Sequence, residues 1–198
     1  MKAEHIIVTC VLGLGIFLAL SPTFLYEASE LEPALTIDDL STAQVEALNA
    51  GPFAKTRQSA EPVQLADAEL IGKDLIIVGV YNKPATIGNF SITPEGTKDV
   101  VTARLSENGT WLWVNTGGGV QRESHVRLQV ENGSMQLTLR SAGNSTWGDH
   151  KVRSWSSIDQ TPMYAIFDPT NGTWTDAWPD AIQTSITGDG EESLWCGF

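Results

Sequence analysis

Residues 126–139 read VRLQVENGSMQLTL, two stretches of alternating apolar and polar residues on either side of Asn132-Gly133. Asparagine and glycine readily adopt the positive φ angles of a two-residue type I′ hairpin turn. Closing the chain there predicts the pairs Glu131–Ser134, Val130–Met135, Gln129–Gln136, Leu128–Leu137, Arg127–Thr138, Val126–Leu139 and His125–Arg140. All the apolar residues then share one face, so the stretch predicts an antiparallel hairpin that packs on a core by that face.

A second hairpin is predicted at Asn108-Gly109, between residues 101–107 and 110–116. The expected pairs are Leu105–Leu112, Ala103–Val114, Arg104–Trp113 and Ser106–Trp111. This register places Arg104, Trp111 and Trp113 together on a face that is otherwise polar, where arginine can form a cation–π contact. These three residues are candidates for an interaction surface, unless a second layer of the fold covers them.

From Val63 onward the chain consists of short β-branched and aromatic runs separated by glycine and asparagine, the pattern of an antiparallel β fold. The run DLIIVGV, Asp74–Val80, is apolar throughout and predicts a central strand buried on both sides. We therefore expect a mainly β protein, with an antiparallel β sandwich or barrel-like domain over residues 63–142.

Residues 143–198 form a Trp-rich C-terminal β extension, with strands expected at 151–156, 163–167 and 182–187 and a third hairpin at Asn171-Gly172. The sequence leaves open whether these strands join the same sheet or a separate lobe. The other candidate interaction residues lie here: Trp147, Trp155, Trp174 and Trp178.

The N-terminal segment, residues 1–26, contains 21 consecutive uncharged residues from Ile6 to Tyr26. At ~1.5 Å per helical residue these span about 30 Å, the thickness of the hydrocarbon core of a bilayer. Lys2 precedes the segment and Glu27 follows it, so we expect a single-pass transmembrane helix with the amino terminus inside. The rest of the chain would then be periplasmic or extracellular. A cleaved signal peptide is the alternative, although cleavage after Ser21 would place Pro22 directly behind the cut bond.

Residues 27–62 are predicted to be an acidic linker that contains one short helix. Between Glu27 and Leu70 there are nine acidic residues and two basic ones, Lys55 and Arg57, so this part contributes −7 to the net charge of −12. Such a chain is repelled by phosphate backbones, so we expect no nucleic-acid partner. Ser41 and Gln44 have the spacing of a capping box, and Gly51 stands where a helix ends in the left-handed conformation. We expect the apolar stripe Leu40, Val45 and Leu48 to dock on the chain's own domain, with a partner as the alternative.

Catalytic and metal-binding patterns are missing from the sequence. His125 and His150 lie in no recognisable motif, and Gly117-Gly118-Gly119 lacks the lysine of a phosphate-binding loop and indicates a flexible loop. Cys10 lies in the predicted membrane segment and Cys196 near the end of the chain, so a disulfide between them would require the tail to fold back into the bilayer, and we expect none within the chain. Four oxygen-bearing residues lie close together but do not match the spacing of a calcium loop: Asp168, Asn171, Asp176 and Asp180. The sequence predicts a protein that is not an enzyme and uses no cofactor or metal.

Two stretches resemble the homology region of the C component of the type II secretion inner-membrane platform and of the related pilus-assembly protein P. Leu75–Val80 is similar to the opening strand of that region, and Val126–Leu139 to its closing hairpin. The order of one amino-terminal span, an extended periplasmic linker and a small all-β region is also similar. The central Gly-Asp turn of the family and its PDZ or coiled-coil end have no counterpart here.

The resemblance implies a non-enzymatic, membrane-anchored scaffold that presents its β domain to other protein subunits of a secretion or pilus machine. The alternatives are an accessory or structural subunit of another membrane complex, or a surface or virion module whose Trp-rich face binds a protein or a glycan. Partner pairing at an exposed strand edge would favour the scaffold, whereas a tryptophan-lined groove would favour the binding module.

Overall fold

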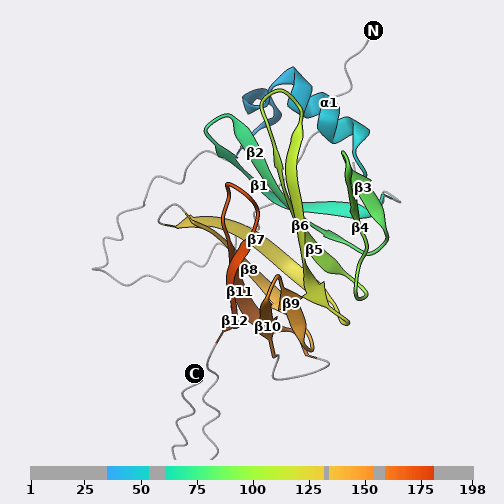
Figure 1. The fold of residues 1–198 in the computed structure, drawn as a ribbon, viewed down its shortest axis with the longest axis vertical. Helices are drawn as coiled ribbons and strands as arrows, with labels where there is room; N and C mark the ends of the chain where they lie inside the picture. The colour runs from blue at the N-terminus through green and yellow to red at the C-terminus, as the bar shows by residue number, and fades with distance from the viewer. Residues whose placement is uncertain (1–34, 54–60, 132–133, 154–158, 181–198) are drawn as a thin grey trace, which may run out of the picture.

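The computed structural model describes residues 35–53, 61–131, 134–153 and 159–180 (Figure 1). The predicted membrane segment, residues 27–34 and 54–60 of the acidic linker, Trp155, Cys196 and the expected strand at 182–187 lie outside these ranges. Within them, no helix has both the length and the apolarity required to cross a bilayer.

The described chain is mainly β, as predicted, and its strands form three antiparallel sheets (Figure 1). The six-stranded sheet has the order β1 (Val63–Ile71), β2 (Asp74–Tyr81), β5 (Asp99–Leu105), β6 (Trp111–Gly119), β9 (Ser145–Trp147) and β10 (His150–Val152). The four-stranded sheet has the order β12 (Trp174–Pro179), β11 (Thr161–Phe167), β8 (Ser134–Ser141) and β7 (Glu123–Glu131). The third sheet is a small hairpin of β3 (Ala85–Ile87) and β4 (Phe90–Ile92). The segment after residue 142 therefore supplies strands to both large sheets.

Two hydrophobic cores lie on the two faces of β2, which is the buried central strand that its apolar run predicts. Its Ile76, Val78 and Val80 belong to the inter-sheet core, which the six-stranded and four-stranded sheets share. Its Leu75, Ile77 and Tyr81 belong to the helix-side core, under α1 (Thr42–Ala50). A polar residue on either face of β2 would be buried, so its sequence does not alternate.

The two large sheets also contact each other through side chains at their edges. The backbone N–H of Leu128 in β7 donates to Oδ2 of Asp67, which lies at a bulge in β1, at 3.0 Å. At the other edge, Nδ1 of His150 in β10 lies 3.9 Å from Oδ1 of Asp176 in β12. These contacts join strands that belong to different sheets.

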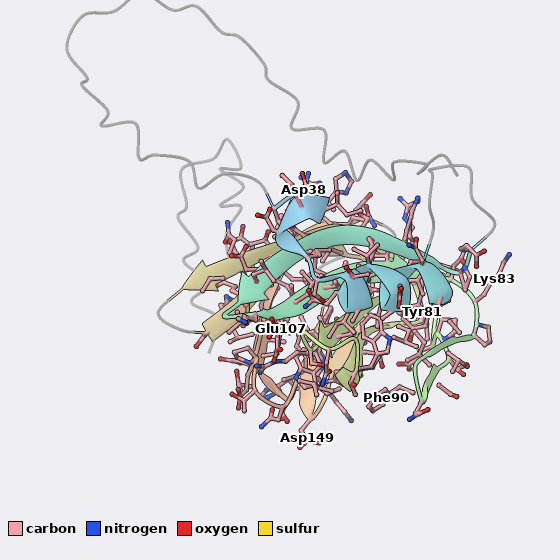
Figure 2. The ribbon with its side chains drawn as sticks, turned by 90° about the horizontal axis from the view of Figure 1, so that it is seen from above. Asp38, Tyr81, Lys83, Phe90, Glu107 and Asp149 are labelled. Atoms are coloured by element: carbon pink, nitrogen blue, oxygen red, sulfur yellow. The ribbon has the colours of Figure 1, made fainter. Side chains whose placement is uncertain are left out.

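Helix α1 docks on the turns that end two hairpins of the six-stranded sheet, and a short 3₁₀ turn, η1 (Ile37–Asp39), precedes it. The predicted capping box is present, because the Gln44 N–H donates to Ser41 Oγ and the Ser41 N–H to Gln44 Oε1. Leu40 and Leu48 pack against the helix-side core, as expected for docking on the chain's own domain, but the third residue of the predicted stripe, Val45, does not belong to that core, and Ala47 packs there instead. Gly51 ends the helix in an extended conformation, with φ −80° and ψ 174°, so the prediction of a left-handed conformation at Gly51 is wrong. Viewed from above, Asp38 of η1 lies at the opposite end from Asp149 of the β9–β10 turn (Figure 2).

Replacing the buried Gln44 is expected to loosen this docking. Its Nε2 donates to the carbonyl of Lys73 at 3.0 Å, and only 1% of the residue is exposed. Gln44→Ala leaves that carbonyl without its donor, so we expect a loss of about 1–3 kcal/mol in the free energy of unfolding. Urea unfolding measures the loss, and Glu46→Ala, on the exposed side of the same helix, is the control. Equal losses for the two variants would contradict the docking role of Gln44.

The β7–β8 hairpin has the predicted register over the half next to the turn, from Glu131–Ser134 to Arg127–Thr138. Beyond it the predicted His125–Arg140 pair is wrong, because Ser124 pairs with Arg140 instead. His125 and Val126 stand together opposite Leu139, which is a β-bulge, and His125 has a φ of 54°. The extra residue lets Val126 keep its place in the inter-sheet core while the strand continues to Glu123.

The β5–β6 hairpin turns through three residues, Glu107 to Gly109, because the Ser106 N–H bonds to the Thr110 carbonyl at 2.9 Å. Gly109 has a φ of 81°, as a three-residue loop with a left-handed third position requires. Leu105 therefore pairs with Trp111, and the predicted Leu105–Leu112 and Ser106–Trp111 pairs are wrong. A bulge then restores the register, so the predicted pairs Ala103–Val114 and Arg104–Trp113 are confirmed.

The glycine run Gly117-Gly118-Gly119 is the end of strand β6 and is buried, so its interpretation as a flexible loop is wrong. Gly118 pairs with Thr146 and Gly119 with Ser145, which joins β9 to the six-stranded sheet. A Cβ atom on Gly119 would lie 2.0 Å from the Asn144 carbonyl oxygen. Glycine is needed here because the neighbouring backbone passes too close for any side chain.

Candidate functional site

The candidate tryptophans of the sequence analysis do not gather on one surface. Trp113, Trp147 and Trp174 lie in the inter-sheet core, and Trp111 packs against the helix-side core, with its ring 5.6 Å from that of Phe53. The β6 bulge at Leu112 explains why Trp111 and Trp113 point to opposite faces of the sheet. Trp178 is the described candidate that keeps a partly exposed ring on an outer surface.

Arg104 holds the β11–β12 turn against the six-stranded sheet. Its Nη2 lies 2.7 Å from Asp74 Oδ2, and its Nη1 donates to the Pro169 carbonyl at 2.9 Å. The Trp113 Nε1 donates to the same carbonyl at 3.2 Å. Arg104 and Trp113 thus act together on one backbone oxygen, which is a structural role for both residues.

The remaining core tryptophans form a chain of edge-to-face aromatic contacts. The ring centroid of Trp147 lies 4.9 Å from that of Trp174, and Trp174 lies 5.5 Å from Phe167. Both indole N–H groups have acceptors, since Trp147 donates to Ser145 Oγ at 3.0 Å and Trp174 to the Thr116 carbonyl at 2.9 Å. A buried tryptophan whose N–H is satisfied is a core residue and not a ligand contact.

The outer face of the four-stranded sheet carries a row of four side chains, one from each strand. The pairing register aligns them in the order Arg127, Thr138, Tyr164 and Trp178. The rings of Tyr164 and Trp178 are stacked, with centroids 5.7 Å apart and an angle of 26° between their planes. A second row runs beside the first and consists of Gln129, Gln136, Ile166 and Asp176. This outer face, defined by the two rows, combines a stacked aromatic pair with exposed polar groups.

A pair of buried carboxyl groups lies where β6 leads into β7. Asp99 is 3% exposed and Glu123 is fully buried. Asp99 Oδ2 accepts the Glu95 N–H at 2.6 Å, and Glu123 Oε1 accepts the Ser141 hydroxyl at 3.0 Å. Their other oxygens, Asp99 Oδ1 and Glu123 Oε2, are buried and have no donor. Both lie within 3.0 Å of the point where Gly118 would carry a Cβ atom, so the two groups converge.

Burial disfavours the charged forms of these acids. It raises the pKa of Glu123 to about 8, and the charge of Asp99 adds to the effect. The pKa of Asp99 is raised for the same reason, and burial together with Asp99 raises the pKa of Tyr81 to about 12. In the sequence both carboxyl groups look like ordinary acids, and no motif marks either one.

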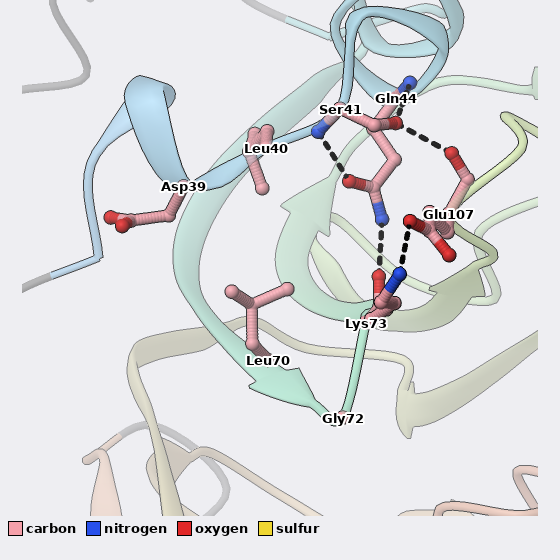
Figure 3. A pocket seen from close by; sticks show the side chains of 8 residues that line it. All are labelled: Asp39, Leu40, Ser41, Gln44, Leu70, Gly72, Lys73 and Glu107. Carbon is pink, nitrogen blue, oxygen red and sulfur yellow. Dashed lines mark hydrogen bonds and ion pairs between the residues drawn. The ribbon is translucent and has the colours of Figure 1, made fainter.

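Surface hollows near α1 contain polar groups that already bind one another (Figure 3). Lys73 Nζ lies 2.8 Å from Glu107 Oε1, and Gln44 bonds to the Lys73 carbonyl. Within the described ranges, no three histidine, cysteine, aspartate or glutamate side chains gather closely enough to hold a metal ion. Asp168 and Asn171, two of the residues that loosely suggest calcium, accept backbone N–H groups of their own turn, both at 2.8 Å.

In comparisons with known proteins, no family model, no curated protein and no solved structure matches this chain. The function is therefore argued from the geometry described above.

Proposed function

We propose that the chain is a non-enzymatic interaction subunit, anchored in a membrane by residues 6–26, with its β domain outside the cytoplasm. The observation that carries the proposal is the stacked pair Tyr164–Trp178 on the outer face of the four-stranded sheet. Aromatic residues and arginine are the side chains that contribute most to protein–protein binding. The resemblance to secretion and pilus scaffolds, carried by Leu75–Val80 and Val126–Leu139, supports an envelope assembly as the setting.

The charge of the outer face indicates which partner surface would fit it. The whole chain carries a net charge of −12, yet this side of the sheet presents the exposed side chains of Arg127 and Arg140, together with the acid Asp176, which lies at the edge strand beside His150. Arginine forks bind carboxylates in two-pronged geometry, and the aromatic pair needs an apolar group above it. We therefore expect a protein partner whose docking surface combines acidic residues with an apolar centre.

The test is extraction of the full chain from its native membrane in mild detergent, followed by native gels and mass spectrometry. The unaltered chain is expected to comigrate with a partner protein. In a Tyr164→Ala/Trp178→Ala double variant, the amount of that partner in the band of the chain is expected to fall at least tenfold. Leu112→Ala is the matched control, since Leu112 is an exposed apolar residue, 46% accessible, on the other large sheet. Partner retention by the double variant would refute the outer face as the interface, and migration of the chain alone would refute the subunit role.

Glycan binding is a second candidate, favoured by the nearly parallel stacking of Tyr164 on Trp178. The partly exposed pair offers aromatic carbon for the apolar face of a sugar ring, and Gln129 and Gln136 lie in the adjacent row to bind hydroxyl groups. Saturable quenching of tryptophan fluorescence by an oligosaccharide, lost in Trp178→Phe, would favour this candidate over a protein partner.

A further inference from the structure

We propose that Asp99 and Glu123 share one proton, and that this proton clamps together the ends of the two large sheets. Asp99 begins β5 in the six-stranded sheet, and Glu123 begins β7 in the four-stranded sheet. Residues 120–122 connect the two sheets at this point, and Ser141 at the end of β8 holds the other oxygen of Glu123. The shared proton would therefore fix the crossover from one layer to the other.

The two unpaired oxygens of Asp99 and Glu123 are buried and converge on one point, which favours a hydrogen atom between the two groups. As two ionised carboxylates, they would bury two negative charges side by side and leave Asp99 Oδ1 and Glu123 Oε2 without donors. One O–H group on Glu123 that donates to Asp99 removes one charge and satisfies both oxygens. A hydrogen bond between the two side chains favours the charged form of Asp99 and the neutral form of Glu123.

Burial places the proton on Glu123. Asp99 accepts backbone N–H groups from Glu95 and Gly96, and Glu123 accepts the Gly119 N–H and the Ser141 hydroxyl, so each acid has two donors that favour its ionised form. Glu123 is the more deeply buried of the two, so ionisation costs more there than at Asp99. The structure thus assigns the acid role to Glu123 and the acceptor role to Asp99.

The charged groups around the pair come from several elements. Tyr81 of β2 stays neutral up to about pH 12, and Glu95, in the loop before β5, adds negative charge near Asp99. Lys98 and Arg122 are the sequence neighbours of the two acids and pair as a β-bridge. The Lys98 ammonium donates to Gln64 Oε1 at 3.3 Å, and Arg122 is exposed. Gly118 of β6 and Ser141 of β8 complete the surroundings without a charge.

The sign of the pH dependence follows from the raised pKa of Glu123. Between its ordinary value of 4.5 and its folded value of about 8, the folded protein holds a proton that the unfolded chain has lost. The unfolding constant contributed by this group therefore rises about tenfold per pH unit across that window and is constant above it. The clamp is strongest in acid and is lost as the pH rises through 8.

The Glu123→Gln variant separates the contribution of Glu123 to the pH dependence of stability from the contributions of the other titratable groups. The glutamine amide can donate to Asp99 as the proton does, while its carbonyl oxygen still accepts from Ser141. For the full chain in detergent, urea unfolding is expected to give nearly equal unfolding constants for the two proteins at pH 4.5. The variant should then gain about tenfold over the unaltered chain with each pH unit up to about 8. Parallel stability curves at every pH would overturn the clamp.

Infrared spectroscopy of the folded protein provides a measurement that does not depend on unfolding. The unaltered chain at pH 7 is expected to show the carbonyl band of one protonated carboxyl group, which is lost in Glu123→Gln and kept in Glu107→Gln, an exposed acid paired with Lys73. A missing band in the unaltered chain would overturn the proposal. A metal cation is the other possible occupant of the two oxygens, so stabilisation of the unaltered chain by Ca²⁺ or Mg²⁺, absent in Glu123→Gln, would also overturn it.

Discussion

A Trp147→Ala variant is expected to lose about 3–5 kcal/mol in its free energy of unfolding, among the largest effects of a single core substitution. Trp147 is fully buried and packs edge-on against Trp174 at 4.9 Å. It belongs to the short strand β9, which pairs with β6 through Ser145 and Thr146, so the side chain of Trp147 adds substantially to what holds β9 against the inter-sheet core. Urea unfolding measures the loss. If the slope of the unfolding free energy against urea concentration is unchanged, the variant and the unaltered chain expose the same surface on unfolding and so share the same fold.

Trp178→Ala is the matched control, because it removes the same side chain from the outer face of the four-stranded sheet. Trp178 makes a cross-strand contact with Tyr164, and such pairs contribute about 0.2–1 kcal/mol. Trp147→Ala should therefore cost several times more than Trp178→Ala. Similar losses for the two variants would mean that β9 is not part of the inter-sheet core.

The strands with regular patterns could be predicted from the sequence. The apolar run of β2 is read as a strand buried on both faces because each face meets a separate core. The β7–β8 register near the turn follows from Asn132-Gly133, because Leu128 must pair with Leu137 to keep the apolar residues together. The bulge at His125 has no such signal in the sequence, and beyond it β7 continues because Ser124 and Glu123 pair with Arg140 and Ser141 of β8.

The face of Trp111 could not be predicted, because Asn108-Gly109 fits two turns of different length. A two-residue turn would place Trp111 with Trp113, whereas the three-residue turn places it opposite Leu105. The bulge at Leu112 then compensates for the one-residue shift in pairing register, so the residues beyond the bulge pair as expected. A change of one residue in loop length reverses the face of a side chain, since strands have a period of two.

The candidate sites were still less visible in the sequence. Tyr164 and Trp178 meet only because β11 and β12 pair, and Arg127 joins their row through two further strands. The buried pair Asp99–Glu123 joins residues from different sheets that no local pattern relates. The one signal in the sequence is the glycine run of residues 117–119, which indicates flexibility by composition alone but in the structure marks a close approach to β9.

Gly119→Ala is expected to destabilise the fold by about 3 kcal/mol, because the added methyl group overlaps backbone that cannot move aside. The Cβ atom would lie 2.0 Å from the carbonyl oxygen of Asn144, the residue before β9. Gly119 pairs with Ser145, so relief of the overlap would break the pairing of β6 with β9 and withdraw Trp147 from the core. Urea unfolding and near-ultraviolet circular dichroism, which reports the packing of the tryptophans, measure the two consequences.

Gly72→Ala is the control that separates steric overlap from backbone strain. Gly72 has a φ of 64°, and a Cβ atom there would meet nothing within 4 Å. Its substitution should therefore cost only the strain of a left-handed residue, about 1–2 kcal/mol, and leave the tryptophan spectrum unchanged. Gly119 carries no such strain, so a larger loss at Gly119 can come only from the closeness of β9. If Gly119→Ala proved the milder of the two, the six-stranded sheet would end at β6 in solution, and β9 with Trp147 would be held by β10 and by the aromatic contacts.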